Sequence, residues 1–208
     1  MHVCVVTRNK SISATTLHSL MNINVYAYVK KFHIEVHFVE NLHAISKLIK
    51  TGERIVWFDY GTNIDESTLP AFFEPFDKEV RVLVAPAVKD EIDWDMFHEK
   101  TIAGSKEPVQ QRALTFDTDV GKKLNDGLYE VTKTSARVFA IEPKQIDKKI
   151  RGGKVPIKLN TDSYGEFFDQ LLKLGIKVAA STKSQVTCHY IHECSGNILE
   201  APGVVVGK

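Results

Sequence analysis

Apolar runs and amphipathic stretches alternate over the first third of the chain. Residues 3–6 and 55–58 are short apolar runs that predict buried strands, and residues 34–39 predict another strand between them. Apolar residues recur at helical spacing in 12–24 and in 42–49, and each stretch has a Ser or Asn near its start that can cap a helix. Two strand–helix–strand units in succession are typical of a parallel sheet with right-handed crossovers.

The pattern becomes less regular after these units. Residues 80–85 predict a further strand, whereas 89–124 are polar, contain few strand signals and include a loop-like stretch at 103–112. Residues 128–131 and 138–141 predict two strands that pair with each other through a short connection.

The last part of the chain predicts one more helix and two more strands. Ser163 and Glu166 form a capping box ahead of an apolar helical face. Strands are expected at 176–180 and 186–194. The chain of 208 residues shows no internal repeat and no linker. We therefore expect one α/β domain, 1–208, with a mostly parallel central sheet flanked by helices.

Composition and charge narrow the class of protein. Hydrophobic residues make up 43% of the chain and charged residues 25%, as in ordinary globular domains. The net charge of +1 lacks the basic excess of a dedicated nucleic-acid-binding protein, so no nucleic-acid partner is expected. No stretch approaches the ~20 apolar residues of a membrane span. Three cysteines are typical of a reducing compartment, so we expect a cytoplasmic protein without a membrane-spanning segment.

Asp59 is the strongest candidate for chemistry, because it directly follows the apolar run 55–58. Ligands of open α/β sheets bind beyond the carboxyl ends of the strands. Mg²⁺ and Mn²⁺ prefer carboxylate oxygens, and substrate phosphates often complete their coordination shell. Gly61 leaves room for a ligand beside this carboxylate. The alternative is that Asp59 only caps the turn at 60–63.

Two Asp-x-Asp triplets offer further carboxylates. Asp93 and Asp95 form the first, and Asp117 and Asp119 form the second. The first pair can instead begin a helix, because acidic residues favour a first helical turn. The second pair lies in a polar connection. Both pairs are candidates for the reacting centre, and neither follows an apolar strand as directly as Asp59 does.

A segment rich in His and Cys lies at 188–194. It lacks the Cys-x-x-Cys pair and the matching second ligand pair of a structural zinc site. His189 and His192 are therefore either ordinary residues of a half-buried strand, or one of them is a second ligand to a metal held by Asp59.

Thr7, Arg8 and Asn9 follow the first predicted strand. An arginine there can contact a base or a phosphate, and the backbone amides at the next helix start favour anions. The chain lacks the Gly-rich motifs of a dinucleotide dehydrogenase and of a P-loop kinase. It also lacks the Gly-x-Ser-x-Gly elbow of many hydrolases. These three classes are disfavoured.

Several of these residues resemble the pattern of a known family. Val-Cys-Val-Val-Thr-Arg-Asn-Lys at 3–10, with Thr-Leu-His-Ser-Leu at 16–20, resembles the opening of GT-A-type glycosyltransferases. Trp-Phe-Asp-Tyr-Gly at 57–61 falls where that fold places its Asp-x-Asp motif, and His189 is similar to a late metal-binding histidine of some members. The order of elements matches over 3–90. The whole chain looks most like the compact glycosyltransferase domains of large DNA viruses of algae, which glycosylate capsid protein.

The resemblance implies a site and a reaction. Residues 1–90 would form a nucleotide-binding half, and 91–208 an acceptor-side half with a C-terminal tail. A UDP-sugar donor would meet Thr7, Arg8, Asn9, Asp59, Tyr60 and Gly61. Asp59 would hold Mn²⁺ or Mg²⁺ with help from His189 or His192. The sugar would pass to a glycan or glycoprotein acceptor, in the host cytoplasm if the protein is viral. An inverting enzyme needs a general base, and its candidates are Asp93, Asp95, Asp117 and Asp119.

The sequence departs from the family at Gly61, which stands where the second Asp of the motif would be. A metal held by Asp59 then needs a ligand from elsewhere in the chain. Two alternatives stay open. One is a nucleotidyltransferase of related fold, which would usually carry a Gly-rich, basic loop that this chain lacks. The other is a non-catalytic module that binds a nucleotide or a glycan.

Overall fold

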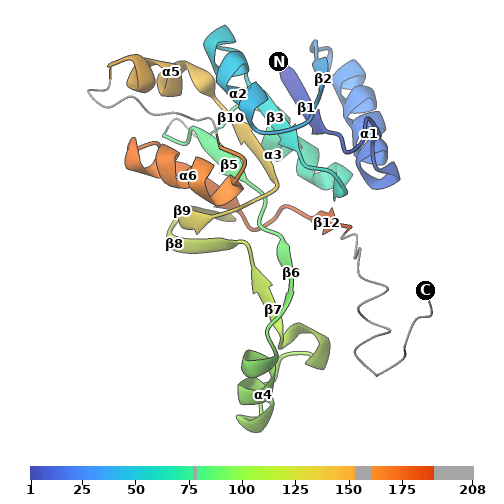
Figure 1. Cartoon of the computed structure of the whole chain (residues 1–208), viewed down its shortest axis with the longest axis vertical. Helices are drawn as coiled ribbons and strands as arrows, with labels where there is room; N and C mark the ends of the chain where they lie inside the picture. The colour runs from blue at the N-terminus through green and yellow to red at the C-terminus, as the bar shows by residue number, and fades with distance from the viewer. Residues whose placement is uncertain (77–78, 153–160, 190–208) are drawn as a thin grey trace, which may run out of the picture.

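An eight-stranded sheet forms the centre of the molecule (Figure 1). The structure is a computed structural model, and it describes residues 1–76, 79–152 and 161–189. The strands, in the order in which they lie side by side, are β2 (Glu35–Val39), β1 (His2–Val6), β3 (Ile55–Phe58), β10 (Val138–Ile141), β5 (Val82–Val84), β11 (Val178–Ser181), β9 (Leu128–Thr134) and β8 (Thr118–Asn125).

Most of these strands run in one direction. β2, β1, β3, β5, β11 and β8 share that direction, whereas β10 and β9 run the opposite way. The expected α/β fold with a mostly parallel central sheet is confirmed.

Helices cover both faces of the sheet (Figure 1). One face packs against α1 (Ala14–Lys30) and α3 (Leu69–Phe73). The other packs against α2 (His43–Leu48), α5 (Pro143–Gly152) and α6 (Tyr164–Lys173). Single turns of 3₁₀-helix lie at η1 (Ile49–Thr51), η2 (Glu66–Thr68) and η3 (Val109–Gln111). In the part of the chain that is described, no helix is long and apolar enough to cross a membrane.

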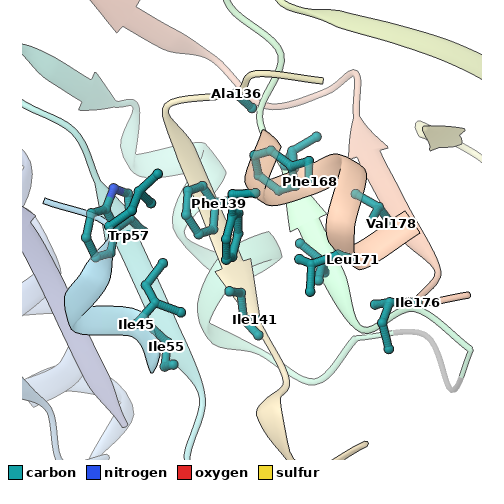
Figure 2. Packing of buried hydrophobic residues seen from close by; sticks show 14 of the residues in the cluster. Ile45, Ile55, Trp57, Ala136, Phe139, Ile141, Phe168, Leu171, Ile176 and Val178 are labelled. Atoms are coloured by element: carbon teal, nitrogen blue, oxygen red, sulfur yellow. The ribbon is translucent and has the colours of Figure 1, made fainter. Parts of the chain in front are cut away.

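The core follows from the two-residue period of the strands. Along β3, Trp57 packs toward one set of helices and its neighbours Val56 and Phe58 toward the other. Figure 2 shows Phe139 of β10 between Trp57 and Phe168 of α6. The rings of Phe139 and Trp57 are stacked, with centroids 5.9 Å apart, and the Phe139 and Phe168 rings meet edge to face at 5.1 Å. Truncating a buried Phe of this kind typically costs about 3–5 kcal/mol.

Local sequence signals mark the starts of two helices, α1 and α6. The Ser13 hydroxyl accepts a hydrogen bond from the Thr16 backbone N–H at the start of α1. The Ser163 hydroxyl does the same for the Glu166 N–H at the start of α6. Each cap satisfies a backbone donor that the helix itself leaves unpaired.

The predicted pairing of residues 128–131 with 138–141 is wrong, although both segments are strands. β9 pairs with β8 and β11, and β10 instead lies antiparallel between β3 and β5. All four residues of β10 are buried, which suits a central position better than a hairpin at the edge.

The polar middle of the chain contains more regular structure than its sequence indicates. β6 (Val88–Ile92) and β7 (Leu114–Phe116) pair antiparallel and carry α4 (Trp94–Ile102) at their far end. Figure 1 shows this unit, which we call the arm, extending away from the central sheet. A second small sheet pairs β4 (Thr62–Ile64) with β12 (Val186–Cys188).

Candidate functional site

A cavity of about 390 Å³ opens beyond the carboxyl ends of β1 and β3. This is the edge of an α/β sheet at which ligands commonly bind. The segments around it come from distant parts of the sequence. The lining residues are Arg8, Asp59, Tyr60, Ser135, Arg137, Asp162, Ser163, Tyr164, Gly165 and His189.

Asp59 lines this cavity and is 7% exposed. Its Oδ1 accepts a hydrogen bond of 2.8 Å from the Tyr60 backbone N–H. Its Oδ2 accepts one of 2.6 Å from Nε of Arg137, and the same guanidinium donates to the Tyr60 carbonyl at 2.6 Å. Asp59 therefore caps its own turn, as the simpler interpretation of the sequence requires, and also forms a buried ion pair at the site.

Arg137 reaches Asp59 because β10 runs against its neighbours. Arg137 precedes the first residue of β10, and an antiparallel strand begins at the edge where parallel strands end. The backbone reinforces this placement, because the Asp59 N–H donates to the Arg137 carbonyl at 3.0 Å. A guanidinium at this edge can neutralise either Asp59 or an incoming anion.

The start of α6 forms another wall of the cavity. Tyr164 accepts a hydrogen bond of 3.1 Å at its hydroxyl from Nε1 of Trp57. Burial raises the pKa of the Tyr164 phenol well above its usual value, and the negative charge of Asp59 raises it further. Tyr164 is thus a neutral hydrogen-bonding group. The amino end of α6 adds a favourable field for an anion in the cavity.

Gly61 and His189 are held together by backbone contacts. The pairing of β4 with β12 continues one step further, so that the His189 N–H donates to the Gly61 carbonyl at 2.7 Å. Gly61 has φ of +76°, and a Cβ on it would lie 2.6 Å from the His189 carbonyl oxygen. A second Asp at this position is therefore incompatible with the close approach of His189.

Arg8 projects from a tight turn after β1. The turn is closed by backbone hydrogen bonds between Arg8 and Ser11, and its two central residues, Asn9 and Lys10, have φ of +50° and +58°. Such angles are typical of a type I′ turn. The guanidinium carbon of Arg8 lies 5.2 Å from the centre of the Tyr60 ring, which fixes the arginine at the cavity mouth.

The other residues predicted after β1 lie outside the cavity lining. The Thr7 hydroxyl donates to the Val39 carbonyl at 3.3 Å, toward β2. Asn9 is exposed at the tip of its turn. Of the six residues expected to meet a nucleotide, Arg8, Asp59 and Tyr60 line the cavity, and Gly61 accepts a hydrogen bond from the lining residue His189.

The predicted general-base candidates are spread over the arm and its base. Asp93 caps α4 by accepting a hydrogen bond of 2.8 Å from the Met96 N–H, and Asp95 is exposed in the first turn of the same helix. Asp119 is exposed on β8. None of these three is among the described residues that line the cavity.

Asp117 lies closer to the site than the other three aspartates. It is 9% exposed, and its Oδ1 accepts hydrogen bonds from the Ala87 N–H at 3.0 Å and the Thr118 hydroxyl at 2.8 Å. Its backbone carbonyl accepts from the N–H of Ser135, which lines the cavity. Asp117 therefore connects the base of the arm to the cavity wall.

Sequence reasoning missed Ser135, Arg137 and the cavity residues at the start of α6. The capping box at Ser163 did mark the start of α6, but no local signal shows that this helix begins beside Asp59. Arg137 was not predicted, because residues 138–141 were expected to pair with 128–131 and not with β3.

The arrangement offers ligands for a cation and donors for an anion. Asp59 and His189 are the described residues of the predicted metal set, and both line the cavity. His192 lies outside the described residues. Carboxylate oxygen and imidazole nitrogen together suit a divalent metal such as Mn²⁺. Arg8, Arg137 and the start of α6 favour a phosphate group beside it.

No protein-family model and no curated protein matches the sequence. Among solved structures, the chain is similar to GalNAc-T7 with UDP, GalNAc and Mn²⁺, with a TM-score of 0.52 and 14% identity. That match covers 92% of this chain and 44% of the GalNAc-T7 chain, so this chain spans less than half of its length. A197 from STIV also matches, with a TM-score of 0.48, 12% identity, and coverage of 92% and 86% of the two chains. The chain has the GT-A fold of glycosyltransferases.

Proposed function

We propose that this protein is a glycosyltransferase that moves a sugar from a UDP-linked donor to a glycan or glycoprotein acceptor, with Mn²⁺ or Mg²⁺ at the diphosphate. One observation carries the proposal. Asp59 and His189, which are 130 positions apart in the sequence, line the same cavity beyond the carboxyl ends of β1 and β3. The solved GT-A structure similar to this chain contains UDP, GalNAc and Mn²⁺.

The close contact at Gly61 supports the choice of His189 as the second metal ligand. Gly61 cannot carry the second carboxylate of an Asp-x-Asp motif, because its Cβ would meet the His189 carbonyl at 2.6 Å. The same contact places the His189 backbone beside Gly61, two residues after Asp59. We therefore infer that an imidazole replaces the missing carboxylate. When bound, the divalent ion would neutralise the negative charge of the leaving nucleoside diphosphate.

Arg8 and Arg137 would bind the donor's phosphates. Arg8 is exposed at the cavity mouth and lies over Tyr60, where it can reach a phosphate without leaving the ring. Arg137 is paired with Asp59 through Oδ2. A metal bound to Asp59 would compete with Arg137 for the same carboxylate. The Arg137 guanidinium could then donate hydrogen bonds to the diphosphate instead.

The acceptor would bind beside the arm. The arm joins the sheet at Ala87 and Asp117, and the Asp117 carbonyl is hydrogen-bonded to the cavity residue Ser135. Asp93, Asp95, Asp117 and Asp119 remain our candidates for the base that deprotonates the acceptor hydroxyl in an inverting reaction. Substitution of each by Asn, with transfer and donor hydrolysis measured separately, would identify the base.

Isothermal titration with UDP, with and without Mn²⁺, tests the proposed donor site. We expect Mn²⁺ to tighten UDP binding by about tenfold or more, which corresponds to about 1.4 kcal/mol. Asp59→Asn and His189→Ala should each remove most of this gain. His98→Ala is the matched control, because His98 is exposed on α4. Equal UDP affinity with and without metal, or an unchanged gain in Asp59→Asn, would refute the assignment.

The ion pair between Asp59 and Arg137 favours a second candidate function. Both Asp59 oxygens already accept hydrogen bonds, so the chain can be a non-catalytic module that binds a nucleotide or glycan without metal.

An assay with a panel of nucleotide sugars distinguishes the glycosyltransferase, the nucleotidyltransferase and the non-catalytic module by the product that each releases. Slow release of UDP with free sugar indicates a glycosyltransferase, and release of pyrophosphate in the presence of nucleoside triphosphate and sugar phosphate indicates a nucleotidyltransferase. Binding without any turnover indicates the module.

A further inference from the structure

A second group of potential metal ligands lies at the opposite end of the sheet. His2 is the first residue of β1, Glu35 is the first residue of β2, and the two are partners in the parallel register. His37 lies two residues beyond Glu35, so both side chains point to the same face of β2. These are the amino ends of the strands, whereas the Asp59 cavity lies beyond the carboxyl ends.

The ligand atoms of this group are spaced as in a metal site. His2 Nδ1 lies 2.9 Å from His37 Nε2 and 3.3 Å from Glu35 Oε2. Glu35 Oε1 lies 3.6 Å from His37 Nε2. Four ligands held tetrahedrally at ~2.0–2.1 Å from zinc are roughly 3.3–3.4 Å from one another. A shift of about half an ångström in one imidazole would bring all three pairs close to that spacing.

A hydrogen-bond relay fixes the orientation and the tautomer of His2. The Thr51 hydroxyl donates to the Leu48 carbonyl at 2.7 Å, so its oxygen must accept from His2 Nε2, which lies 3.0 Å away. The Nε2 of His2 therefore carries the proton. Its Nδ1 then presents a lone pair to Glu35 and His37. Metal-binding histidines are usually oriented in this way by a partner on the other ring nitrogen.

We propose that His2 Nδ1, His37 Nε2 and the Glu35 carboxylate bind one Zn²⁺ ion, which joins the edge strand β2 to β1. Two imidazoles and one carboxylate suit zinc better than Mg²⁺ or Ca²⁺, which prefer oxygen ligands. The ion can enter from solvent, because the Glu35 side chain is 60% exposed while that of His2 is 7% exposed. Solvent would occupy the fourth position. This site does not depend on the proposed transferase function.

Titration with Co²⁺, which replaces zinc and absorbs visible light, tests this proposal. The parent protein carries Asp59→Asn and His189→Ala, so that the cavity beyond β3 cannot contribute its two predicted ligands. We expect one equivalent of Co²⁺ to produce a visible absorption band and Zn²⁺ to abolish it. Glu35→Gln and His37→Gln should each weaken Co²⁺ binding by about 100-fold or more, since even indirect partners of metal ligands contribute 10–100-fold. His98→Gln should bind as the parent does.

Thermal unfolding provides a second measurement and a folding control. Zn²⁺ should raise the melting temperature of the parent protein, because it binds only the folded state, and should leave His37→Gln unchanged. His37 lies on an edge strand and its side chain is 25% exposed, so the variant is expected to fold without metal. A visible band of equal strength in His37→Gln, or no band in the parent, would overturn the proposal. In the latter case the two imidazoles share only a hydrogen bond.

Discussion

At the scale of single residues, the contact between Gly61 and His189 determines which side chains position 61 can carry. Two constraints act together. The positive φ of Gly61 disfavours any residue with a Cβ, and the His189 carbonyl would lie 2.6 Å from that Cβ. The sequence shows only that an Asp is missing, whereas the structure gives the steric reason.

Gly61→Ala should destabilise the protein by about 2 kcal/mol or more, because the left-handed backbone costs about 1–2 kcal/mol and the clash adds to it. Gly104→Ala is the matched control. Gly104 also has a positive φ, of +67°, but nothing lies within 4 Å of the position that a Cβ would take there. Urea unfolding of both variants isolates the contribution of the contact with His189. Equal losses in the two variants would show that this contact does not constrain position 61.

Asp117 should make stability depend on pH in a predictable direction. Burial raises its pKa, and this outweighs the hydrogen bonds from Ala87 and Thr118 that lower it. The folded protein therefore binds this proton more tightly than the unfolded chain does. The contribution of Asp117 to stability is then largest below its unfolded pKa of about 3.8 and is lost as the pH rises through the folded value.

Asp117→Asn keeps an oxygen acceptor for the Ala87 N–H and has no proton to lose. The free energy of unfolding of this variant, relative to the natural protein, should therefore rise between pH 4 and pH 7 in urea titrations. Asp119→Asn is the control, because its side chain is exposed. A relative free energy that stays constant with pH for Asp117→Asn would contradict the expected effect of burial.

At the scale of elements, the arm is a separable unit. α4 has no buried residue, and β6 pairs only with β7 among the described strands. The two ends of the arm are adjacent, because the Asp117 N–H donates to the Ala87 carbonyl at 2.9 Å. A short turn could therefore join Ala87 directly to Asp117 if the arm were removed.

Replacing residues 88–116 by Asn-Gly, which favours tight turns, should leave the central domain folded. Circular dichroism should show a cooperative melt within about 2–4 °C of the full chain, equivalent to about 1 kcal/mol in a domain of this size. UDP binding should persist, because the cavity residues lie elsewhere. Transfer to an acceptor should be lost while donor hydrolysis continues. An unfolded product, or lost UDP binding, would mean that the arm supports the cavity.

Elements differ in how well their sequence predicts them. β1 and β3 were predicted because they are continuous buried apolar runs, and α1 because it buries apolar residues at helical spacing behind the cap Ser13. β8 was missed because most of its residues are exposed, so its sequence, Thr-Asp-Val-Gly-Lys-Lys-Leu-Asn, has no apolar alternation. β8 is a strand because it pairs with β9, and the spacing of apolar residues along the sequence does not predict this pairing.

At the scale of the whole molecule, β10 joins the two parts of the sheet. β3 and β5 have no direct pairing, and each pairs with β10 instead. The sequence predicted the strand at 138–141 and the fold class, but not this position, because strand order depends on contacts between distant residues. The place of Arg137 beside Asp59 depends on the same long-range contact. The core that includes Trp57, Val84 and Phe139 therefore contains residues from both sides of residue 90.

A fragment of residues 1–90 should consequently fail to fold. It would contain β1, β2, β3 and β5 but would lack the strand that connects β5 to the others. The core residues Phe139, Phe167 and Phe168 would also be absent. Proton NMR should show poor dispersion for the fragment and good dispersion for the full chain. A folded fragment would show that β1, β2, β3 and β5 form a stable core without β10 between β3 and β5.

The position of β10 also has a consequence during translation. Ribosomes produce β1, β2 and β3 early, but the second partner of β3 emerges only after residues 138–141 have been made. At about 5–20 residues per second, the roughly 80 intervening residues take on the order of 4–16 s to synthesise. Throughout this interval the nascent chain exposes an apolar strand edge of the kind that templates aggregation. We expect chaperones that recognise extended apolar segments to bind the nascent chain at β3, Ile-Val-Trp-Phe, until β10 arrives.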